Sequence, residues 1–494
     1  MSTIKVTNLT FSYPFTYTNI FENCSFSIDT DWKLGFVGRN GRGKTTFLKL
    51  LQNQYSYSGN IVSSVQFDYF PYEVADVKMN TIDVVYQLAP DCMEWQIVRE
   101  LNLLEVSEDV LYRSFETLSC GEQTKVLLAA FFLNDRNFHL IDEPTNHLDS
   151  HGRKVVAEYL SKKKSFILVS HDRDFLDKCV DHILSLNKKT IEVQCGNYST
   201  WKQNFDNRQI NEQKNNDRLS KEINSLKESA RRMMEWSDKI ESTKIGSGAF
   251  DRGYIGTQAA LMMKHAKSVE KRRQRAIEEK SALLKDLEFA PQLKLHAMPY
   301  VQSKLVELKD VAVFYDDRQV FEPLSFTINQ GDRVVLNGTN GCGKSSLIKL
   351  ILGEKLKYSG ELWRGNNLEI SYICQGTSHL RGTVYSYAQD NKVDLTLFLT
   401  ILRKLDFSRE QFDKPIESFS MGQKKKVLVA GSLAKPAHLY IWDEPLNYID
   451  LYSRLQIEQL VQSANATMLV VEHDTAFQHQ IATRIVNITK RCWK

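Results

Sequence analysis

Two segments of the sequence have the composition of a phosphate-binding loop. Each has the pattern Gly-x-x-x-x-Gly-Lys-Ser/Thr, at residues 38–45 and again at residues 338–345. Glycines allow successive backbone N–H groups to converge on phosphate oxygens at the start of a helix. The lysine of each loop can then neutralise the terminal phosphates, and its last hydroxyl group can bind Mg²⁺. The sequence therefore predicts two sites for ATP with Mg²⁺.

The predicted nucleotide-binding residues come from both loops and from the residue after each. In the first loop they are Gly38, Arg39, Asn40, Gly41, Arg42, Gly43, Lys44, Thr45 and Thr46. In the second loop they are Gly338, Thr339, Asn340, Gly341, Cys342, Gly343, Lys344, Ser345 and Ser346.

The duplication extends beyond the two loops. Four kinds of polar residue recur 300 to 302 positions later, as the pairs Lys44 and Lys344, Ser119 and Ser420, Glu143 and Glu444, and His171 and His473. This period is far too long for a solenoid repeat. We therefore predict two domains of one kind, residues 1–197 and 291–494, with residues 198–290 between them.

An acidic pair follows an apolar run in each half. Residues 138–141 precede Asp142 and Glu143, and Asp443 and Glu444 occupy the same place in the second half. An aspartate at the end of a buried strand can hold Mg²⁺, and the next glutamate can orient and deprotonate an attacking water. An isolated Asp-Glu pair is more often a solvated turn. The position about 100 residues after a phosphate loop favours the catalytic interpretation instead.

The elements that position these residues alternate between strands and helices. Apolar strands are expected at residues 34–38, 138–141 and 166–169, with helices at residues 45–52 and from residue 118 onward. The polar residues follow the carboxyl ends of the strands. This order predicts an α/β fold with a parallel sheet in each domain.

The composition is that of an ordinary globular chain. The 494 residues are 42% hydrophobic and 25% charged, with a formal net charge of +4. No apolar stretch approaches the roughly 18 residues that a membrane span needs, and the N-terminus enters a strand pattern instead of a signal peptide. The eight cysteines are scattered, with no zinc-type spacing, and are expected to be reduced or simply buried. We therefore expect a cytoplasmic protein.

These motifs resemble those of the ATP-binding cassette ATPases over about four-fifths of the chain. Residues 118–123 and 419–423 resemble the signature segment of that family. His171 and His473 resemble its switch histidines. The aromatic residues that would stack on adenine are Tyr13 and Tyr315.

The resemblance implies that the two cassettes pair head to tail within one monomeric chain, so that each ATP lies between one phosphate loop and the other cassette's signature serine. The first site would contain Tyr13, the loop 38–45, Asp142, Glu143 and His171, completed by Ser420 and Gly422. The second would contain Tyr315, the loop 338–345, Gln375, Asp443, Glu444 and His473, completed by Ser119 and Gly121. The implied metal-binding residues are Thr45, Asp142, Ser345, Gln375 and Asp443, and the implied catalytic residues are Glu143, Glu444, His171 and His473.

The two predicted sites differ at one position. Residues 69–72 align with residues 372–375, which places Tyr72 where the family has the glutamine that the second half keeps as Gln375. A phenol does not offer the amide oxygen that contacts Mg²⁺ and the attacking water. We therefore predict slower hydrolysis at the first site. A tolerated substitution, with water in place of the amide, is the alternative.

The acidic motif also indicates a branch of the family. Residues 142–149, Asp-Glu-Pro-Thr-Asn-His-Leu-Asp, resemble the motif of the ABC-F branch, whose members are tandem cassettes that act on ribosomes. The second copy, residues 444–450, has diverged but keeps Pro445, Asn447 and Asp450.

The segment between the cassettes has the pattern of a coiled coil. It is proline-free and highly charged from about residue 198 to 288, and its apolar residues recur at steps of three and four: Leu219, Ile223, Leu226, Ala230 and Met233, then Ala266, Val269, Ala276, Leu283 and Leu287. This pattern predicts a long antiparallel α-helical hairpin.

The outer part of the predicted hairpin is basic and rich in apolar side chains at its turn. Residues 229–277 carry eleven cations and five carboxylates, a net charge of +6. Such a charge favours nucleic acid, although a solvated helix face and a tip that packs on itself are the alternatives. The candidate ribosome-contacting residues of the tip are Lys244, Phe250, Arg252 and Tyr254.

Within the branch, the chain resembles the antibiotic-resistance members of the Lsa type in three respects: the predicted hairpin, the absence of transmembrane segments and the sequence of residues 31–45. The resemblance implies a bacterial 70S ribosome as partner, with contacts to rRNA and tRNA in the exit site and no membrane partner. It also implies that the hairpin displaces lincosamides, streptogramin A compounds or pleuromutilins, and that ATP hydrolysis permits release. The alternatives are a housekeeping factor for stalled ribosomes, a transporter ATPase subunit and a DNA-repair ATPase.

Overall fold

The structure is a computed structural model that describes residues 2–14, 19–134, 137–146, 148–187, 190–243, 269, 271–272, 293, 295, 297–315 and 318–489. The chain divides into two compact units, one made of Met1–Trp201 with Ala290–Lys494 and the other of Lys202–Phe289. The first unit contains both predicted cassettes, which are called here the first half (residues up to 197) and the second half (residues from 297).

The first half contains a largely parallel sheet with the strand order β5-β6-β7-β3-β8-β9, in which only β9 is antiparallel to its neighbour. Its strands are β3 (Lys33–Gly38), β5 (Phe67–Phe70), β6 (Phe138–Asp142), β7 (Phe166–Val169), β8 (His182–Leu186) and β9 (Ile191–Cys195). A separate antiparallel sheet has the order β2-β1-β4 and consists of β1 (Thr3–Phe11), β2 (Phe21–Asp29) and β4 (Ser58–Val62).

The second half repeats this plan. Its parallel sheet has the order β15-β16-β17-β13-β18, with β13 (Arg333–Asn337), β15 (Ile370–Ile373), β16 (Leu439–Asp443), β17 (Met468–Val471) and β18 (Arg484–Asn487). Its antiparallel sheet is built around β10 (Lys304–Tyr315), which pairs with β11 (Arg318–Gln319), β12 (Leu324–Asn329) and β14 (Lys357–Arg364).

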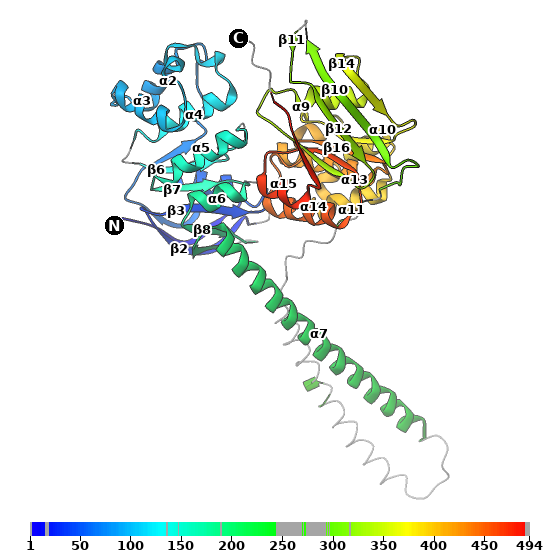
Figure 1. The fold of residues 1–494 in the computed structure, drawn as a ribbon. Coiled ribbons are helices and arrows are strands. Elements are labelled where there is room, and N and C mark those ends of the chain that lie inside the picture. Colours follow the sequence, from blue (N-terminus) through cyan, green and yellow to red (C-terminus); the bar gives the residue numbers. More distant parts are fainter. Residues whose placement is uncertain are drawn as a thin grey trace, which may run out of the picture. The chain divides into compact units, whose positions relative to one another are not determined.

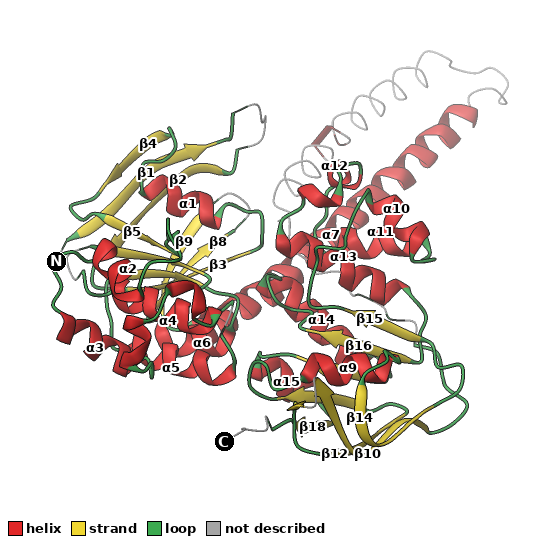
Figure 2. Cartoon of the chain, turned by 90° about the horizontal axis from the view of Figure 1, so that it is seen from above, coloured by secondary structure: helices red, strands yellow, loops and turns green. Residues whose placement is uncertain are grey.

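Helices connect and cover the parallel strands of each half (Figures 1 and 2). Those of the first half are α1 (Lys44–Leu51), α2 (Thr81–Leu88), α3 (Glu94–Leu103), α4 (Cys120–Phe131), α5 (Ser150–Ser161) and α6 (Arg173–Cys179). Those of the second half are α9 (Lys344–Leu352), α10 (Val384–Asp390), α11 (Leu395–Lys404), α12 (Arg409–Phe412), α13 (Met421–Ala434), α14 (Leu451–Ser463) and α15 (Thr475–Ile481).

The central strands are parallel because their sequences are apolar on both faces. All four residues of β7, Phe-Ile-Leu-Val, and all four of β17, Met-Leu-Val-Val, are buried. Parallel strands covered by helices on both sides require such continuous apolar runs, whereas one-sided strands alternate. The predicted α/β fold is therefore confirmed, and β6 extends one residue further than predicted, to Asp142.

The helix α7 (Tyr198–Thr243) begins the segment between the halves and has 46 residues, about 69 Å at 1.5 Å per residue. The side chain of Asn197 accepts a hydrogen bond from the backbone N–H of Thr200 at 3.1 Å, which satisfies one free donor at the helix start. The predicted tip residues Lys244, Phe250, Arg252 and Tyr254, and nearly all of the predicted return arm, lie outside the described residues. The hairpin therefore stays a prediction. No helix in the described part of the chain is long and apolar enough to cross a membrane.

His139 is a buried ionisable residue within this fold. It lies on β6 and is 3% exposed, with its ring centroid 4.8 Å from that of Phe131 and 4.6 Å from that of Phe132. Its Nδ1 atom has no hydrogen-bond partner. Burial, assisted by the positive charge of Lys163, lowers the pKa of His139 to about 4. The folded protein therefore keeps this imidazole neutral at pH values where the unfolded chain protonates it.

We expect the free energy of unfolding to fall as the pH decreases from about 6.5 to about 4, because only the unfolded state binds the proton in that window. The contribution of His139 is on the order of 3 kcal/mol at the acid end. His139→Leu should remove this part of the pH dependence, as measured by urea unfolding at several pH values. His151→Leu, at an exposed histidine, is the control. The same acid dependence in parent and His139→Leu would contradict this account.

Candidate ATP-binding and hydrolysis sites

Each phosphate loop connects a parallel strand to a helix and depends on glycine at its last turn. Gly43 has φ +105° and Gly343 has φ +101°. A Cβ atom on Gly43 would lie 2.5 Å from Ile20 Cγ2, and one on Gly343 would lie 2.6 Å from Val320 Cγ1. Both positions are therefore restricted to glycine by conformation and by space.

The lysines of the loops fold back over the backbone. The Nζ atom of Lys44 donates to the carbonyl of Gly38 at 2.6 Å, and that of Lys344 donates to the carbonyl of Gly338 at 2.7 Å. Both ammonium groups are more than nine-tenths buried within their loops. A phosphate bound at the start of α1 or α9 would therefore meet a fixed positive charge and the free N–H groups of the first helical turn.

The order of the strands brings the hydroxyl and carboxylate groups of each site together. In both sheets one strand separates the strand before the loop from the strand before the acidic pair. Thr45 Oγ1 donates to Asp142 Oδ2 at 2.8 Å, and Ser345 Oγ donates to Asp443 Oδ2 at 2.9 Å. These oxygen pairs have the chemistry that Mg²⁺ requires from a protein beside bound phosphates.

The two glutamates that follow have an unusual backbone. Glu143 has φ +53° and Glu444 has φ +50°, a backbone conformation that residues other than glycine rarely adopt. The backbone N–H of each residue donates to a carbonyl of the adjacent strand, Val169 or Val471, at 2.9 Å. Such strain persists where the surrounding structure fixes it, and it occurs most often at functional sites.

The surroundings of the two glutamates differ. Gln375 Nε2 donates to Glu444 Oε2 at 2.8 Å, and Asn447 Nδ2 donates to the same oxygen at 2.7 Å. Glu143 Oε1 lies 3.2 Å from Nε2 of His171 but makes no hydrogen bond. The second glutamate is therefore oriented by two amide groups.

The pairing of the strands shows which residue of the first half corresponds to Gln375. Tyr69 pairs with Leu140 in the first half, and Tyr372 pairs with Ile441 at the matching place in the second. The register therefore aligns Tyr72 with Gln375, as the sequence predicts, but Tyr72 is not among the residues that line the first cavity, whereas Gln375 lines the second. Tyr69, however, takes part directly, because its hydroxyl group donates to Asp142 Oδ2 at 3.0 Å.

The electrostatic environment also shifts the pKa values of the two glutamates in opposite directions. Burial, together with the adjacent charge of Asp142, raises the pKa of Glu143 to about 8. Burial acts in the same direction on Glu444, but the nearby His473 imidazole and the Gln375 amide outweigh it and leave the pKa of Glu444 below its ordinary value. The pKa of His171 is lowered by burial and by the charge of Lys44.

Two cavities lie over these residues, and each has walls from both halves. The first has a volume of about 630 Å³. The predicted site residues in its wall are Asn40, Gly41, Arg42, Lys44, Thr45, Asp142, Glu143, His171, Ser420 and Gly422. The second has a volume of about 580 Å³. The predicted site residues in its wall are Tyr315, Asn340, Gly341, Gly343, Lys344, Ser345, Ser346, Gln375, Glu444 and His473.

Both volumes fall within the roughly 300–1,000 Å³ of small-molecule sites. The first cavity carries the signature residues Ser420 and Gly422 of the opposite half, as expected. In the second cavity, Cys120 lines the wall instead of its neighbours Ser119 and Gly121. The hydroxyl oxygen of Ser119 caps its own helix by accepting the backbone N–H of Glu122 at 3.2 Å, as that of Ser420 does with Gln423 at 3.3 Å. The head-to-tail arrangement is therefore closer to the predicted one at the first site.

The two tyrosines expected at adenine make matching hydroxyl contacts but differ in whether they line a cavity. Tyr315 lines the second cavity, is 45% exposed and lies with its hydroxyl group 3.2 Å from Ser346 Oγ. Tyr13 is not part of the wall of the first cavity. Its ring packs against Phe11 at 5.2 Å between ring centroids and against Tyr55 at 5.7 Å. Its hydroxyl group lies 2.7 Å from Thr46 Oγ1, which matches the contact of Tyr315 with Ser346, so the adenine role of Tyr13 stays a prediction.

Lys426 is a residue of the first cavity wall that the sequence analysis missed. Lys426 Nζ lies 2.6 Å from Asp450 Oδ2, and the two side chains are 6% and 1% exposed. Lys426 lines the first cavity. A run of three lysines directly after the second signature segment was the available signal, since the first half has Lys125 alone at the matching place.

Gly422 lies at a close approach between the halves. A Cβ atom there would lie 2.4 Å from the carbonyl oxygen of Tyr448 and 3.0 Å from Asn40 Nδ2. Asn40 belongs to the first phosphate loop and donates to that same carbonyl at 2.8 Å. A methyl group at Gly422 would therefore displace the carbonyl and break the bond between the halves.

We expect Gly422→Ala to reduce ATP turnover at least about 10-fold, because displacements near 1 Å at a reacting centre have effects of this size or larger. Steady-state phosphate release measures the effect. Gly376→Ala is the matched control, since a Cβ atom at Gly376 meets nothing within 4 Å. Equal turnover in the two variants would contradict the proposed close contact.

The comparison with known families agrees with this geometry. The family described as ABC transporter matches residues 21–146 and 321–447, about half of the chain. The chain therefore belongs to this family of ATP-binding cassette proteins, which bind and hydrolyse ATP. Its relatives include ABC transporter F family member 2 of Arabidopsis thaliana, which is 25% identical over 99% of this chain and 76% of that protein.

A more specific likeness is to the ribosome protection protein VmlR of Bacillus subtilis strain 168. It is 28% identical over 479 residues, which cover 96% of this chain and 84% of that protein. The ATP-binding protein Uup of Caulobacter vibrioides is 26% identical over 94% of this chain and 74% of that protein. Among solved structures, the archaeal ribosome recycling factor aABCE1 in complex with the ribosomal stalk protein aP1 shares the fold. It has a TM-score of 0.64, 20% identity, and coverage of 97% of this chain and 87% of that one.

Proposed function

We propose that this ABC-F ATPase is a ribosome protection factor. It binds the exit site of the bacterial 70S ribosome with ATP in both sites, and residues 198–290 reach toward the peptidyl-transferase region. There the segment dislodges lincosamides, streptogramin A compounds or pleuromutilins, and ATP hydrolysis permits release. The observation that carries the proposal is the likeness to VmlR, which runs over 96% of the chain and so includes the segment between the cassettes.

The site geometry supports an ATP-dependent clamp. Each cavity takes walls from both halves, so bound ATP would stabilise their closed arrangement. Glu143 and Glu444 would orient and deprotonate the attacking waters. Oxygens of Thr45 with Asp142, and of Ser345 with Asp443, would hold Mg²⁺ in the two sites. When bound, Mg²⁺ neutralises charge on the phosphates.

Expression in a susceptible bacterium tests the drug-related part of the proposal. Cells that produce the protein should grow at concentrations of lincomycin or tiamulin that stop the parent strain. Cells that produce Lys44→Ala with Lys344→Ala, which removes both phosphate-loop cations, should remain susceptible. Unchanged tolerance with an abundant wild-type protein would contradict protection.

A housekeeping role at stalled ribosomes is the second candidate. Relatives named Uup match nearly the whole chain at 25–26% identity, close to the value for VmlR. This candidate predicts ribosome binding without any gain in drug tolerance. The two functions therefore share the ribosome-binding result and separate in the growth test.

The predicted tip gives a further test, although it lies outside the described residues. Deletion of residues 246–254 should leave ATP turnover within about twofold of the parent, because the described residues that line the two cavities belong to the two halves. The same deletion should abolish drug tolerance. Equal losses of ATP turnover and tolerance would instead assign the tip a structural role.

A further inference from the structure

One buried guanidinium group contacts the loops that carry both switch histidines. Arg454 lies in the first turn of α14 and is 6% exposed. Its Nη1 atom donates to the carbonyl oxygen of His171 at 2.9 Å and to Asp474 Oδ2 at 3.3 Å. His171 lies in the wall of the first cavity, and Asp474 directly follows His473 in the second.

The local structure fixes the direction of this side chain. Asp450 caps α14 by accepting the backbone N–H of Ser453 at 3.0 Å, and Arg454 Nε donates to the carbonyl of Ile449 at 2.9 Å. The planar guanidinium is thus held at Nε while Nη1 reaches both loops. A lysine would keep the charge but could not make these contacts from one rigid fork.

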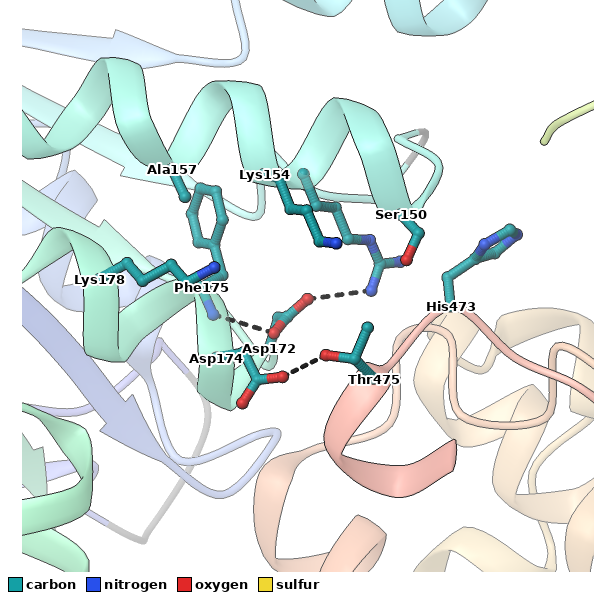
Figure 3. Close-up of a pocket in the computed structure, with 10 residues that line it drawn as sticks. Ser150, Lys154, Ala157, Asp172, Asp174, Phe175, Lys178, His473 and Thr475 are labelled. Atoms are coloured by element: carbon teal, nitrogen blue, oxygen red, sulfur yellow. Dashed lines mark hydrogen bonds and ion pairs between the residues drawn. The ribbon is translucent and has the colours of Figure 1, made fainter. Parts of the chain in front are cut away.

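The corresponding residue of the first half makes no such connection among the described residues. Arg153 occupies the same place on α5, where its Nη1 donates to Asp172 Oδ2 at 3.1 Å and its Nε to Leu148 O at 3.2 Å. Both acceptors belong to its own half. Figure 3 shows the bond to Asp172, with His473 on the other side of the small pocket.

A neighbouring ion pair crosses between the halves on the same side. Arg173 Nη2 donates to Glu458 Oε2 at 2.6 Å, and Glu458 lies one turn after Arg454 on α14. The corresponding residues are Thr475 and Ala157, which cannot form an ion pair. Thr475 instead bonds to Asp174, as Figure 3 shows. Charged contacts therefore run from α14 to the first half, without a symmetric copy from α5.

We propose that Arg454 is a positioning residue that couples the two ATP sites, because it joins the backbone of the His171 loop to the loop that carries His473. ATP in the first cavity positions His171. The carbonyl group of His171 then fixes the position of the Arg454 guanidinium, which in turn positions the loop of His473 through Asp474. Linkage requires the effect on ATP affinity to be reciprocal. This inference concerns the ATPase sites alone and does not depend on a ribosomal role.

Binding of ATP to the hydrolysis-deficient variant Glu143→Gln with Glu444→Gln tests the inference without turnover. A fluorescent ATP analogue should bind this protein with a Hill coefficient above 1. Adding Arg454→Lys should reduce the ratio between the second and first binding constants at least about 5-fold and bring the Hill coefficient toward 1. Glu458→Gln is the matched control on the same helix. It weakens the interface but should keep the cooperativity.

Three results would overturn the inference: a Hill coefficient of 1 in the starting protein, an unchanged coefficient after Arg454→Lys, or equal losses with Glu458→Gln. Thermal unfolding checks that each variant is folded. If Arg454→Lys does not fold, Asp474→Asn serves as the second variant, because it removes the carboxylate that ties the guanidinium to the second switch loop. It should lower the cooperativity in the same way, and retained cooperativity would overturn the inference.

Discussion

The double variant Glu143→Gln with Glu444→Gln is expected to lose ATP turnover at least about 100-fold while it still binds ATP. Each glutamate is held by a strained backbone at the end of a buried strand, and each lies in a cavity wall. An amide of the same size cannot accept the proton of the attacking water. The groups that hold phosphate are the lysines and backbone N–H groups of the loops, which the substitutions leave in place.

Phosphate release and binding of a fluorescent ATP analogue measure the two parts of this expectation. Glu158→Gln with Glu361→Gln is the control, because both of these glutamates are exposed and lie outside the cavities. The control should turn over ATP within about twofold of the parent. Turnover by the site variant within about threefold of the parent would assign the chemistry to other residues.

The second large effect is the difference in ATP turnover between the two single-glutamate variants. Glu444→Gln should remove most of the ATP turnover, whereas Glu143→Gln should leave more than about half of it. Glu444 is oriented by the amides of Gln375 and Asn447, and its pKa lies below the ordinary value. Glu143 makes no hydrogen bond through Oε1, and burial with the adjacent charge of Asp142 raises its pKa to about 8.

Tyr72, which aligns with Gln375, provides a gain-of-function test of the predicted asymmetry between the two ATP sites. Tyr72→Gln, introduced into the Glu444→Gln background, should raise the remaining turnover severalfold, because it supplies the missing amide to the first site. Tyr86→Gln, at a tyrosine on α2 that does not align with Gln375, is the control. Equal losses in the two single-glutamate variants, and no gain from Tyr72→Gln, would contradict functional asymmetry.

Much of the fold was predictable because its signals are local. The apolar runs of β6 and β7 and the loops before α1 and α9 follow from short segments of sequence, since buried parallel strands and phosphate loops constrain neighbouring residues. The alignment of Tyr72 with Gln375 was also predictable. It needed only the constant offset between the halves, which strand pairing reproduces.

The contacts between the halves were not predictable in the same way. Arg454 and His171 are separated by 283 residues, and their bond depends on how two folded surfaces meet. Tyr69 shows a second limit, because no pattern indicates that its hydroxyl group reaches Asp142 while Tyr372 makes no such bond to Asp443 among the described residues.

The central claim, that ATP closes the two halves and so allows ribosome binding, is tested most directly by co-sedimentation with bacterial 70S ribosomes. The Glu143→Gln, Glu444→Gln protein with ATP, and the wild-type protein with a non-hydrolysable ATP analogue, should both sediment with ribosomes. Neither protein should do so without nucleotide. If the proteins remain in the supernatant with nucleotide bound, or sediment equally without it, the account is contradicted.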